Sequence, residues 1–231
     1  MTPSPVDWGG LHNARDLGGL GGVIALGALF RSPRLDGLDG DGWARFERSG
    51  VRTIVDLRND DEVAPLPSRP AGVRVIRAPI EDQADTDFMA AWGTSLGTPD
   101  YYSDNLRRWP SLVAAAISAV ADAPEGGVLV HCAAGRDRTG LVVALLLRVA
   151  GVDAVDVLHD YEVGMRETNA FLRSHPQHET ALDDDELATA VEAKRASLGG
   201  LLADLDVNAY LVAAGVSRVQ LERLRARLTA R

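Results

Sequence analysis

Residues 127–150, with the sequence GVLVHCAAGRDRTGLVVALLLRVA, decide how this chain folds. The apolar run Gly127–His131 follows a Pro-Glu-Gly-Gly turn and predicts a short buried strand. From Thr139 to Ala150 the residues are again mostly apolar, and Gly151 follows, which is typical of a buried helix that ends at a glycine. Residues 132–138 therefore form a loop between the end of a strand and the first turn of a helix.

This loop carries the groups that are needed for nucleophilic attack on a phosphate ester. The pattern is His-Cys-x5-Arg-Thr-Gly, and Cys132 is the only cysteine of the chain. Unpaired amides and the dipole at a helix N-terminus favour bound anions and the thiolate form of a cysteine. Cys132 is predicted to attack phosphorus and to form a cysteinyl-phosphate, while the planar fork of Arg138 holds two phosphate oxygens. The third oxygen is assigned to the backbone of the loop, whose residues are Ala133, Ala134, Gly135, Arg136, Asp137 and Arg138.

Other interpretations of the loop are open. A lone cysteine at a strand end is often a small buried apolar residue, and a rhodanese-like sulfurtransferase also places cysteine before a helix. The Arg-Thr-Gly ending favours phosphate over both. Thr139 is expected either to place its hydroxyl near the sulfur and ease its departure, or to cap the helix. His131 is expected to fix the loop from below and not to act as a base.

The stretch resembles the signature loop of the cysteine-dependent protein tyrosine phosphatases, and more narrowly their bacterial, mycobacterial-type branch, in which a basic residue and Asp precede the arginine. Further segments resemble this family in the expected order: Asn13–Gly19, Leu29–Ser32, Thr53–Arg58 with Glu62, Tyr210–Leu211 and Gly215–Ser217. The resemblance implies a phosphatase for phosphotyrosine in proteins, with phosphoserine and phosphothreonine as further substrates. It implies no metal or other cofactor, and helices at about 152–205 that fold over the site as a lid.

The leaving group needs a proton donor, and three aspartates are candidates. Asp82 lies in an acidic loop after a predicted strand, where the resemblance implies an Asp beside the active site. Asp137 lies within the signature loop, and its alternative role is to pair with Arg15 or Arg58 and brace that loop. Asp100 is the weakest candidate, because a cap of the following helix explains it equally well. Asp82 is preferred.

The rest of the chain predicts an α/β fold with a central mixed or parallel sheet, flanking helices and a largely helical C-terminal half. Residues 1–231 are expected to form one domain. A glycine-rich hairpin is expected at residues 20–31, and strands at Val51–Leu57 and Val73–Ile80. Helices are expected over the following ranges: Asp41–Ser49, Tyr101–Asp122 with a break at Trp109-Pro110, Ala154–Phe171, Asp183–Leu198 and Val216–Arg231.

Composition limits the classes of partner. The net charge is −9, which argues against nucleic acid or an anionic membrane surface as the main partner. A single cysteine suits a reducing compartment, and the N-terminus shows no signal peptide, so a cytoplasmic location is expected, with export by another route left open. The longest apolar run, Leu141–Leu147, is too short to cross a bilayer. No obligate protein partner is implied.

Two further questions stay open at this point. His175 and His178 with the acidic run Asp183–Asp185 suggest a metal site, but an exposed loop that leads into helix N-cap residues is preferred. Arg136 adds positive charge at the floor of the phosphate pocket, which keeps a phosphoinositide phosphatase as an alternative, beside a non-catalytic phosphate-binding module. Aromatic side chains that either rim the pocket or fill the core are Trp92, Tyr101, Tyr102 and Trp109.

Overall fold

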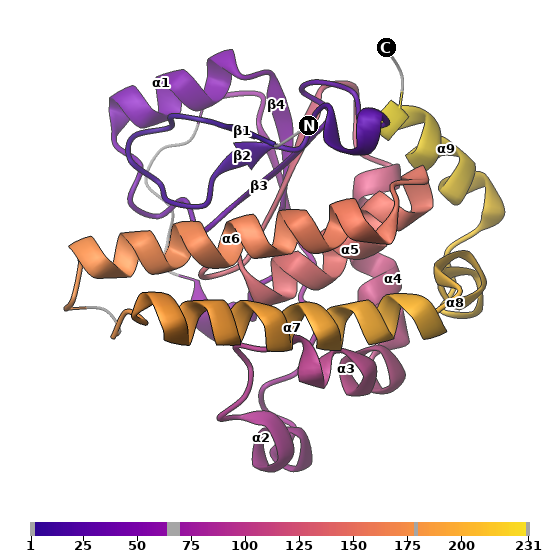
Figure 1. Cartoon of the computed structure of the whole chain (residues 1–231). Coiled ribbons are helices and arrows are strands. Elements are labelled where there is room, and N and C mark those ends of the chain that lie inside the picture. Colours follow the sequence, from indigo (N-terminus) through magenta and orange to yellow (C-terminus); the bar gives the residue numbers. More distant parts are fainter. Residues whose placement is uncertain (1–2, 64–69, 178–179, 230–231) are drawn as a thin grey trace.

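A mixed sheet lies at the centre of the molecule (Figure 1). The structure, a computed structural model, describes residues 3–63, 70–177 and 180–229. The strand order is β1-β2-β3-β6-β4-β5, with β3, β6, β4 and β5 parallel and the short strands β1 and β2 antiparallel at one edge. The strands are β1 (Ser4–Pro5), β2 (Arg15–Asp16), β3 (Leu29–Ser32), β4 (Val51–Asp56), β5 (Arg74–Arg77) and β6 (Gly127–His131). The expected α/β architecture is confirmed.

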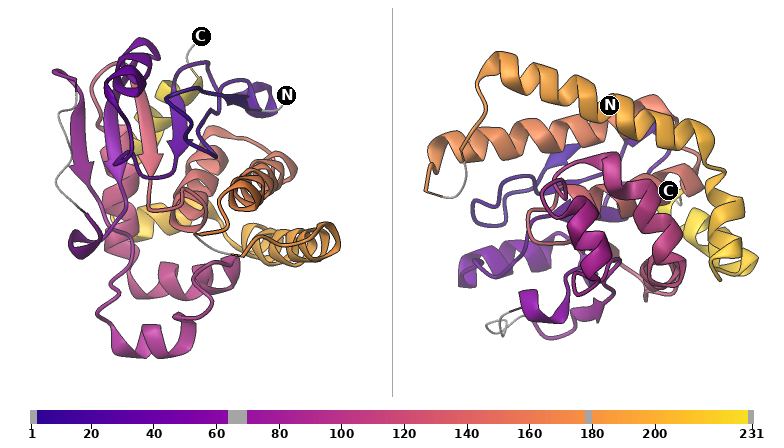
Figure 2. Two further views of the ribbon diagram at one scale, coloured as in Figure 1. Left: turned by 90° about the vertical axis from the view of Figure 1, so that its left-hand side faces the viewer. Right: turned by 90° about the horizontal axis from the view of Figure 1, so that it is seen from below.

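Helices surround this sheet and dominate the C-terminal half (Figures 1 and 2). The α-helices are α1 (Gly40–Arg48), α2 (Thr86–Trp92), α3 (Tyr102–Arg108), α4 (Pro110–Ala121), α5 (Asp137–Ala150), α6 (Ala154–Ser174), α7 (Asp184–Asp204), α8 (Val207–Ala213) and α9 (Arg218–Thr229). Short 3-10 helices are η1 (Leu20–Gly22), η2 (Asp60–Glu62) and η3 (Pro99–Tyr101).

The alternation of side chains along the central strands divides the core into two parts. Ile54 and Leu129 lie in the smaller cluster, together with Trp43 and Phe46 of α1. Their neighbours along the strands, Val55, Val128 and Val130, face the opposite side of the sheet. They join the larger cluster, to which α4 and α5 contribute most of the side chains. Strand β6 is therefore buried on both faces, as its continuous apolar sequence requires.

Most elements lie where the sequence places them. The helical stretch is interrupted at Trp109, between α3 and α4, because Pro110 begins the second helix. Asp183 caps α7, and its side chain accepts hydrogen bonds from the amides of Asp185 and Glu186.

The hairpin expected at residues 20–31 is wrong. Only the end of this segment, from Leu29, forms a strand, and its antiparallel partner is β2. The side chain of Asp16 accepts hydrogen bonds from the amides of Gly18 and Gly27, each at 2.8 Å, so the intervening chain wraps around one carboxylate. Left-handed backbone at Gly21 (φ 59°) kinks the short 3-10 helix η1, so the chain turns here and does not extend as a strand.

Helices α6 and α7 run side by side along one flank of the molecule (Figures 1 and 2). Their range covers the segment that the family resemblance assigns to a lid, and the lid function stays a prediction. Within the described residues, none of the helices combines the length and the apolar character that crossing a membrane requires.

Candidate active site

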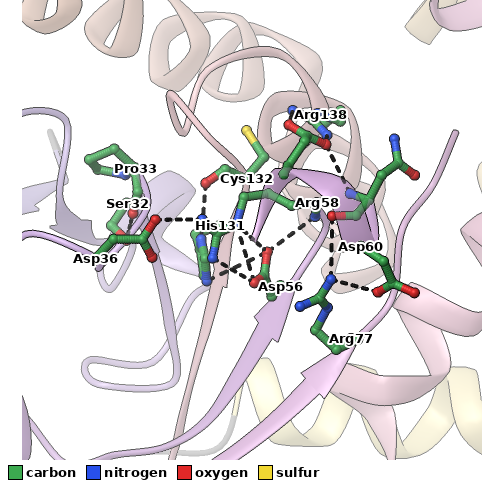
Figure 3. Close-up of polar contacts among 12 residues, drawn as sticks. Ser32, Pro33, Asp36, Asp56, Arg58, Asp60, Arg77, His131, Cys132 and Arg138 are labelled. Carbon is green, nitrogen blue, oxygen red and sulfur yellow. Dashed lines mark hydrogen bonds and ion pairs between the residues drawn. The ribbon is translucent and has the colours of Figure 1, made fainter. Parts of the chain in front are cut away.

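Cys132 lies directly after β6, in the middle of the sheet. Its neighbour His131 pairs with Ser32 at the end of β3 and with Asp56 at the end of β4, so three parallel strands end together below the loop. The thiol side chain is 3% exposed and lies on the same side as Arg138 (Figure 3). The carboxyl ends of the strands thus place the sulfur at the opening of the signature loop.

The loop packs so closely on β3 that it requires glycine at one position. Gly135 has φ +67°, and a Cβ atom there would lie 2.3 Å from the carbonyl oxygen of Ser32. The amide of Arg34 donates to the carbonyl oxygen of Ala133 at 2.9 Å. Across the part of the chain that the structure describes, the loop amides that have no protein acceptor are those of Ala133, Ala134, Gly135, Asp137 and Arg138. These N–H groups can bind the oxygens of an anion.

A buried ion cluster holds the outer side of the loop. Asp160 of α6 accepts from Arg15 at 2.8 Å and from Arg31 at 2.5 Å. Arg31 also donates to the carbonyl oxygen of Gly135 at 2.6 Å, and Asn13 donates to the same oxygen at 3.0 Å. The two guanidinium groups outweigh the effect of burial and keep the pKa of Asp160 below its usual value. Three distant segments therefore fix the carbonyl side of the loop.

Arg138 lies between two carboxylates. Glu62 accepts from both terminal nitrogens of Arg138, at 2.5 and 2.6 Å, and Oε1 of Glu81 lies 3.5 Å from its Nε. Burial raises the pKa of Glu62, but the hydrogen bonds from Arg138 outweigh burial, and the net shift is downward. The ionised Glu62 thus fixes the orientation of the guanidinium group.

The residues below the loop support the neutral form of His131. Burial lowers the pKa of His131, against the opposing charge of Asp56. Nδ1 of the ring lies 3.0 Å from the carbonyl oxygen of Cys132, which can only accept, so Nδ1 carries the hydrogen. Arg58 binds both Asp56 and Asp36 beneath the loop (Figure 3). His131 therefore fixes the backbone of Cys132, as expected.

Asp137 braces the loop through other partners than expected. Its carboxylate accepts from the hydroxyl of Tyr161 at 2.8 Å and from Nε of Arg136 at 2.8 Å. The expected pairing with Arg15 or Arg58 is wrong, because Arg15 binds Asp160 and Arg58 binds the aspartates below the loop. Both oxygens of Asp137 are acceptors in this arrangement.

The side chain of Arg136 contacts Asp137 and extends to Gly97. Its Nε binds Asp137, and its guanidinium lies so near Gly97 that a Cβ there would be 2.9 Å from Nη2. It lines a cavity of about 240 Å³ between α6 and α7, together with Lys194. Arg136 also lines a larger cavity together with Ala133 and Ala134, so its place at the floor of the phosphate pocket stays a prediction.

Asp82 and Asp100 are both exposed. Asp82 follows β5, and its side chain accepts from the amide of Ala84 at 2.9 Å. Asp100 does not cap the helix that follows, because it lies inside η3, whose N-cap is Thr98. Glu81, directly before Asp82, is buried against Arg138; sequence reasoning missed it, since an acidic residue in an acidic loop gives no sign of burial.

Thr139 lies inside α5 and not at its N-cap, which is Arg136, so the capping role is wrong. Its hydroxyl is buried and, among the described residues, has no hydrogen-bond partner. This leaves the hydroxyl available to the sulfur or to a ligand.

The aromatic side chains divide between core and edge. Tyr101 and Tyr102 are buried in the larger core cluster, and the hydroxyl of Tyr102 donates to the carbonyl oxygen of Asp137 at 2.7 Å. Trp92 and Trp109 are half-buried and pack on the same cluster. Tyr101 and Tyr102 are therefore core residues that do not rim the pocket, and Tyr102 also supports the loop from within.

The metal site suggested by His175 and His178 cannot be followed as a whole in the structure, because His178 lies outside the described residues. The ring of His175 stacks on Phe171 at 4.1 Å. In residues 3–63, 70–177 and 180–229, no three side chains of the metal-binding types lie together.

Comparison with known proteins agrees with this geometry. The family described as "Tyrosine phosphatase family" matches residues 6–230. The chain is 35% identical to the triple specificity protein phosphatase PtpB of Mycobacterium tuberculosis over 66% of this chain and 66% of that protein, slightly less than two thirds of its length. It is 28% identical to a tyrosine-protein phosphatase of Nostoc commune over 84% of this chain and 71% of that protein.

A solved structure, that of P. aeruginosa TpbA in complex with pTyr, is similar at 20% identity and a TM-score of 0.45, covering 93% of this chain and 96% of that one. The tyrosine phosphatase family matches residues 6–230, and this range includes the loop around Cys132, the strand and the helix that flank the loop, and the ion cluster that holds it. The chain belongs to the tyrosine phosphatase family.

Proposed function

We propose that this protein hydrolyses phosphate monoesters through a cysteinyl-phosphate, with phosphotyrosine in proteins as its main substrate. The observation that carries this proposal is the position of Cys132 at the opening of a loop whose amides have no protein acceptor in the described part of the chain, beside an arginine held by Glu62. Such a site binds a phosphoryl group and stabilises the charge of its transition state without a cofactor.

The reaction has two displacements. The thiolate of Cys132 attacks phosphorus, the S–P bond forms, and the P–O bond to the leaving group breaks. The leaving oxygen takes a proton from an acid on the protein. Water then attacks phosphorus, and the thiolate leaves with inorganic phosphate as product. The hydroxyl of Thr139, buried and without a protein partner among the described residues, is assigned to the departing sulfur.

Asp82 is proposed as the acid. Asp137 is the weaker candidate, because its two oxygens already accept hydrogen bonds from Tyr161 and Arg136 and brace the loop. Asp82 is exposed and follows directly on Glu81, which lies beside Arg138, so it is assigned to the side of the site that a leaving group can reach.

The Asp82→Asn variant is expected to lose about 100- to 10,000-fold in the rate of phosphotyrosine hydrolysis. A phosphate ester with a very acidic leaving alcohol needs no proton, so its rate should change little. Rates for a series of aryl phosphates measure this difference. Asp137→Asn serves as the control and should slow all substrates alike; if it alone showed the dependence on leaving group, the acid would be Asp137.

Substrate class is tested with phosphotyrosine, phosphoserine and phosphothreonine peptides and with phosphoinositide vesicles, in the presence and absence of EDTA. We expect phosphotyrosine peptides to react fastest and the chelator to leave the rate unchanged. The name of the mycobacterial relative, a triple specificity phosphatase, supports inclusion of all of these substrates. Faster turnover of phosphoinositides would favour the lipid phosphatase, and turnover of none would favour a phosphate-binding module.

Within residues 152–205, we propose that α6 is a fixed wall and that α7 is the part that covers the site. Asp160 and Tyr161 tie α6 to the loop through buried contacts. Helix α7 reaches the rim through Lys194, which donates to the carbonyl oxygen of Gly97 at 2.6 Å, and Arg195, which binds Glu162 of α6.

A further inference from the structure

Glu81 is a buried carboxyl group beside the arginine of the site. The residue follows β5 in the loop that also carries Asp82, and it is 2% exposed. Oε1 accepts a hydrogen bond from Gln83 at 2.8 Å and lies 3.5 Å from Nε of Arg138. Oε2 is buried and, within the described residues, has no hydrogen-bond partner.

This position is unfavourable for an ionised carboxyl group. A buried carboxylate oxygen without a partner loses its hydration and gains nothing in return. Arg138 does not compensate fully, because its terminal nitrogens bind Glu62 and the separation from Nε exceeds hydrogen-bond length. Packing of the fold alone therefore does not explain a glutamate at residue 81.

The position of Glu81 coincides with the edge of Arg138 that a phosphate would take. A guanidinium group offers two edges for bidentate binding, one between the terminal nitrogens and one that includes Nε. Glu62 takes the first edge, so a phosphoryl group in the loop must use the second. Glu81 and a bound phosphate thus compete for the same N–H groups.

We propose that Glu81 faces the phosphate-binding edge of Arg138 and takes up a proton from solvent when a phosphate dianion binds there. The proposal rests on the proposed function, since it requires that the signature loop binds phosphate. A further negative charge near a carboxyl group favours its neutral form. Neutral Glu81 no longer competes for Nε of Arg138, and its hydroxyl gives the unpartnered oxygen a hydrogen to donate.

The surroundings of Glu81 support proton uptake. Burial raises its pKa; Arg138 and Gln83 oppose this, whereas Glu62 and Asp137 reinforce it, and the net shift is upward. Tyr101 of η3 also faces this group, and burial raises the pKa of its phenol well above the usual value, so it stays neutral. The group in this cluster that gains a proton as an anion arrives is therefore Glu81.

The proposal predicts the sign of a pH effect. Below the pKa of Glu81 in the free protein, the group is already neutral and anion binding takes up no proton. Between this pKa and the higher pKa of Glu81 in the anion-bound protein, each dianion that binds takes up as much as about one proton, so affinity falls with rising pH by up to about tenfold per unit. Glu81→Gln keeps the shape of the side chain without its charge and should remove this slope.

Sulfate is the probe, because it stays a dianion over the whole pH range of the experiment. The Cys132→Ser protein is the background, so that titration of the thiol contributes nothing. Calorimetry in buffers of different ionisation enthalpy then counts the protons taken up when sulfate binds. We expect uptake that approaches one proton for the Cys132→Ser protein at pH values between the pKa of Glu81 in the free protein and its higher pKa in the anion-bound protein, and none for the Cys132→Ser/Glu81→Gln protein.

Cys132→Ser/Asp60→Asn is the matched control, since it removes the charge of an exposed carboxylate that pairs with Arg77 and not with Arg138, and its proton uptake should persist. Sulfate binding without proton uptake by the Cys132→Ser protein would overturn the proposal, as would equal uptake after Glu81→Gln. Absence of sulfate binding to the Cys132→Ser protein would contradict the proposed function itself, and the proposal with it.

Discussion

Replacement of Cys132 by serine is expected to reduce the hydrolysis of p-nitrophenyl phosphate to below about a thousandth of the wild-type rate. A serine hydroxyl in this position stays protonated, and the neighbouring His131 is not placed to remove the proton, because its Nδ1 donates to the carbonyl oxygen of residue 132. The measurement is the steady-state rate at saturating substrate.

The same variant should still bind vanadate or phosphate. The groups that bind the anion are the backbone amides and Arg138, and the substitution leaves both in place. Residual turnover well above a thousandth of wild type would contradict covalent catalysis by Cys132. Loss of anion binding together with activity would indicate that the loop had changed shape.

Replacement of Asp160 by alanine is expected to destabilise the protein by about 3–5 kcal/mol, the usual effect of removing one partner from a buried ion pair. Arg15 and Arg31 would then both be buried without this carboxylate. Because Arg31 also binds the carbonyl oxygen of Gly135, activity should fall as well. Urea unfolding monitored by circular dichroism measures the change in stability.

Asp122→Ala is the matched control, because Asp122 pairs with Arg223 at the surface. Its loss should change stability by at most about 1 kcal/mol. The pKa of Asp160 is lowered in the folded state, so its contribution is present above the unfolded-state pKa and is lost as pH falls through the folded-state value. Equal effects of the two substitutions at neutral pH would contradict the structural role of the buried cluster.

The central part of the fold could be predicted because its signals are local. The strand before Cys132 and the helix after Arg138 are continuous apolar runs with clear ends, and the structure has them as β6 and α5. The segment at residues 20–31 could not be predicted in the same way. Its course depends on hydrogen bonds from glycine amides to Asp16, and a pattern of apolar residues does not report these.

The residues that orient the site were harder to predict than those that form it. Cys132, Arg138 and the loop follow from one motif, whereas Asp160 lies 145 positions after Arg15, its partner. Glu62 was noted only through the family resemblance, and its two bonds to Arg138 span 76 positions. Tertiary packing determines which acidic residues are buried against an arginine. The spacing of residues in the sequence carries no information about this packing.

The covalent intermediate is the most direct test of the account. Wild-type protein would be mixed with p-nitrophenyl phosphate, quenched in acid within milliseconds, digested, and analysed by mass spectrometry. The account predicts a phosphoryl group on the sulfur of Cys132, present at short times and absent once substrate is exhausted. A phosphoryl group on another residue, or product formation at the full rate without phosphorylation of Cys132, would contradict it.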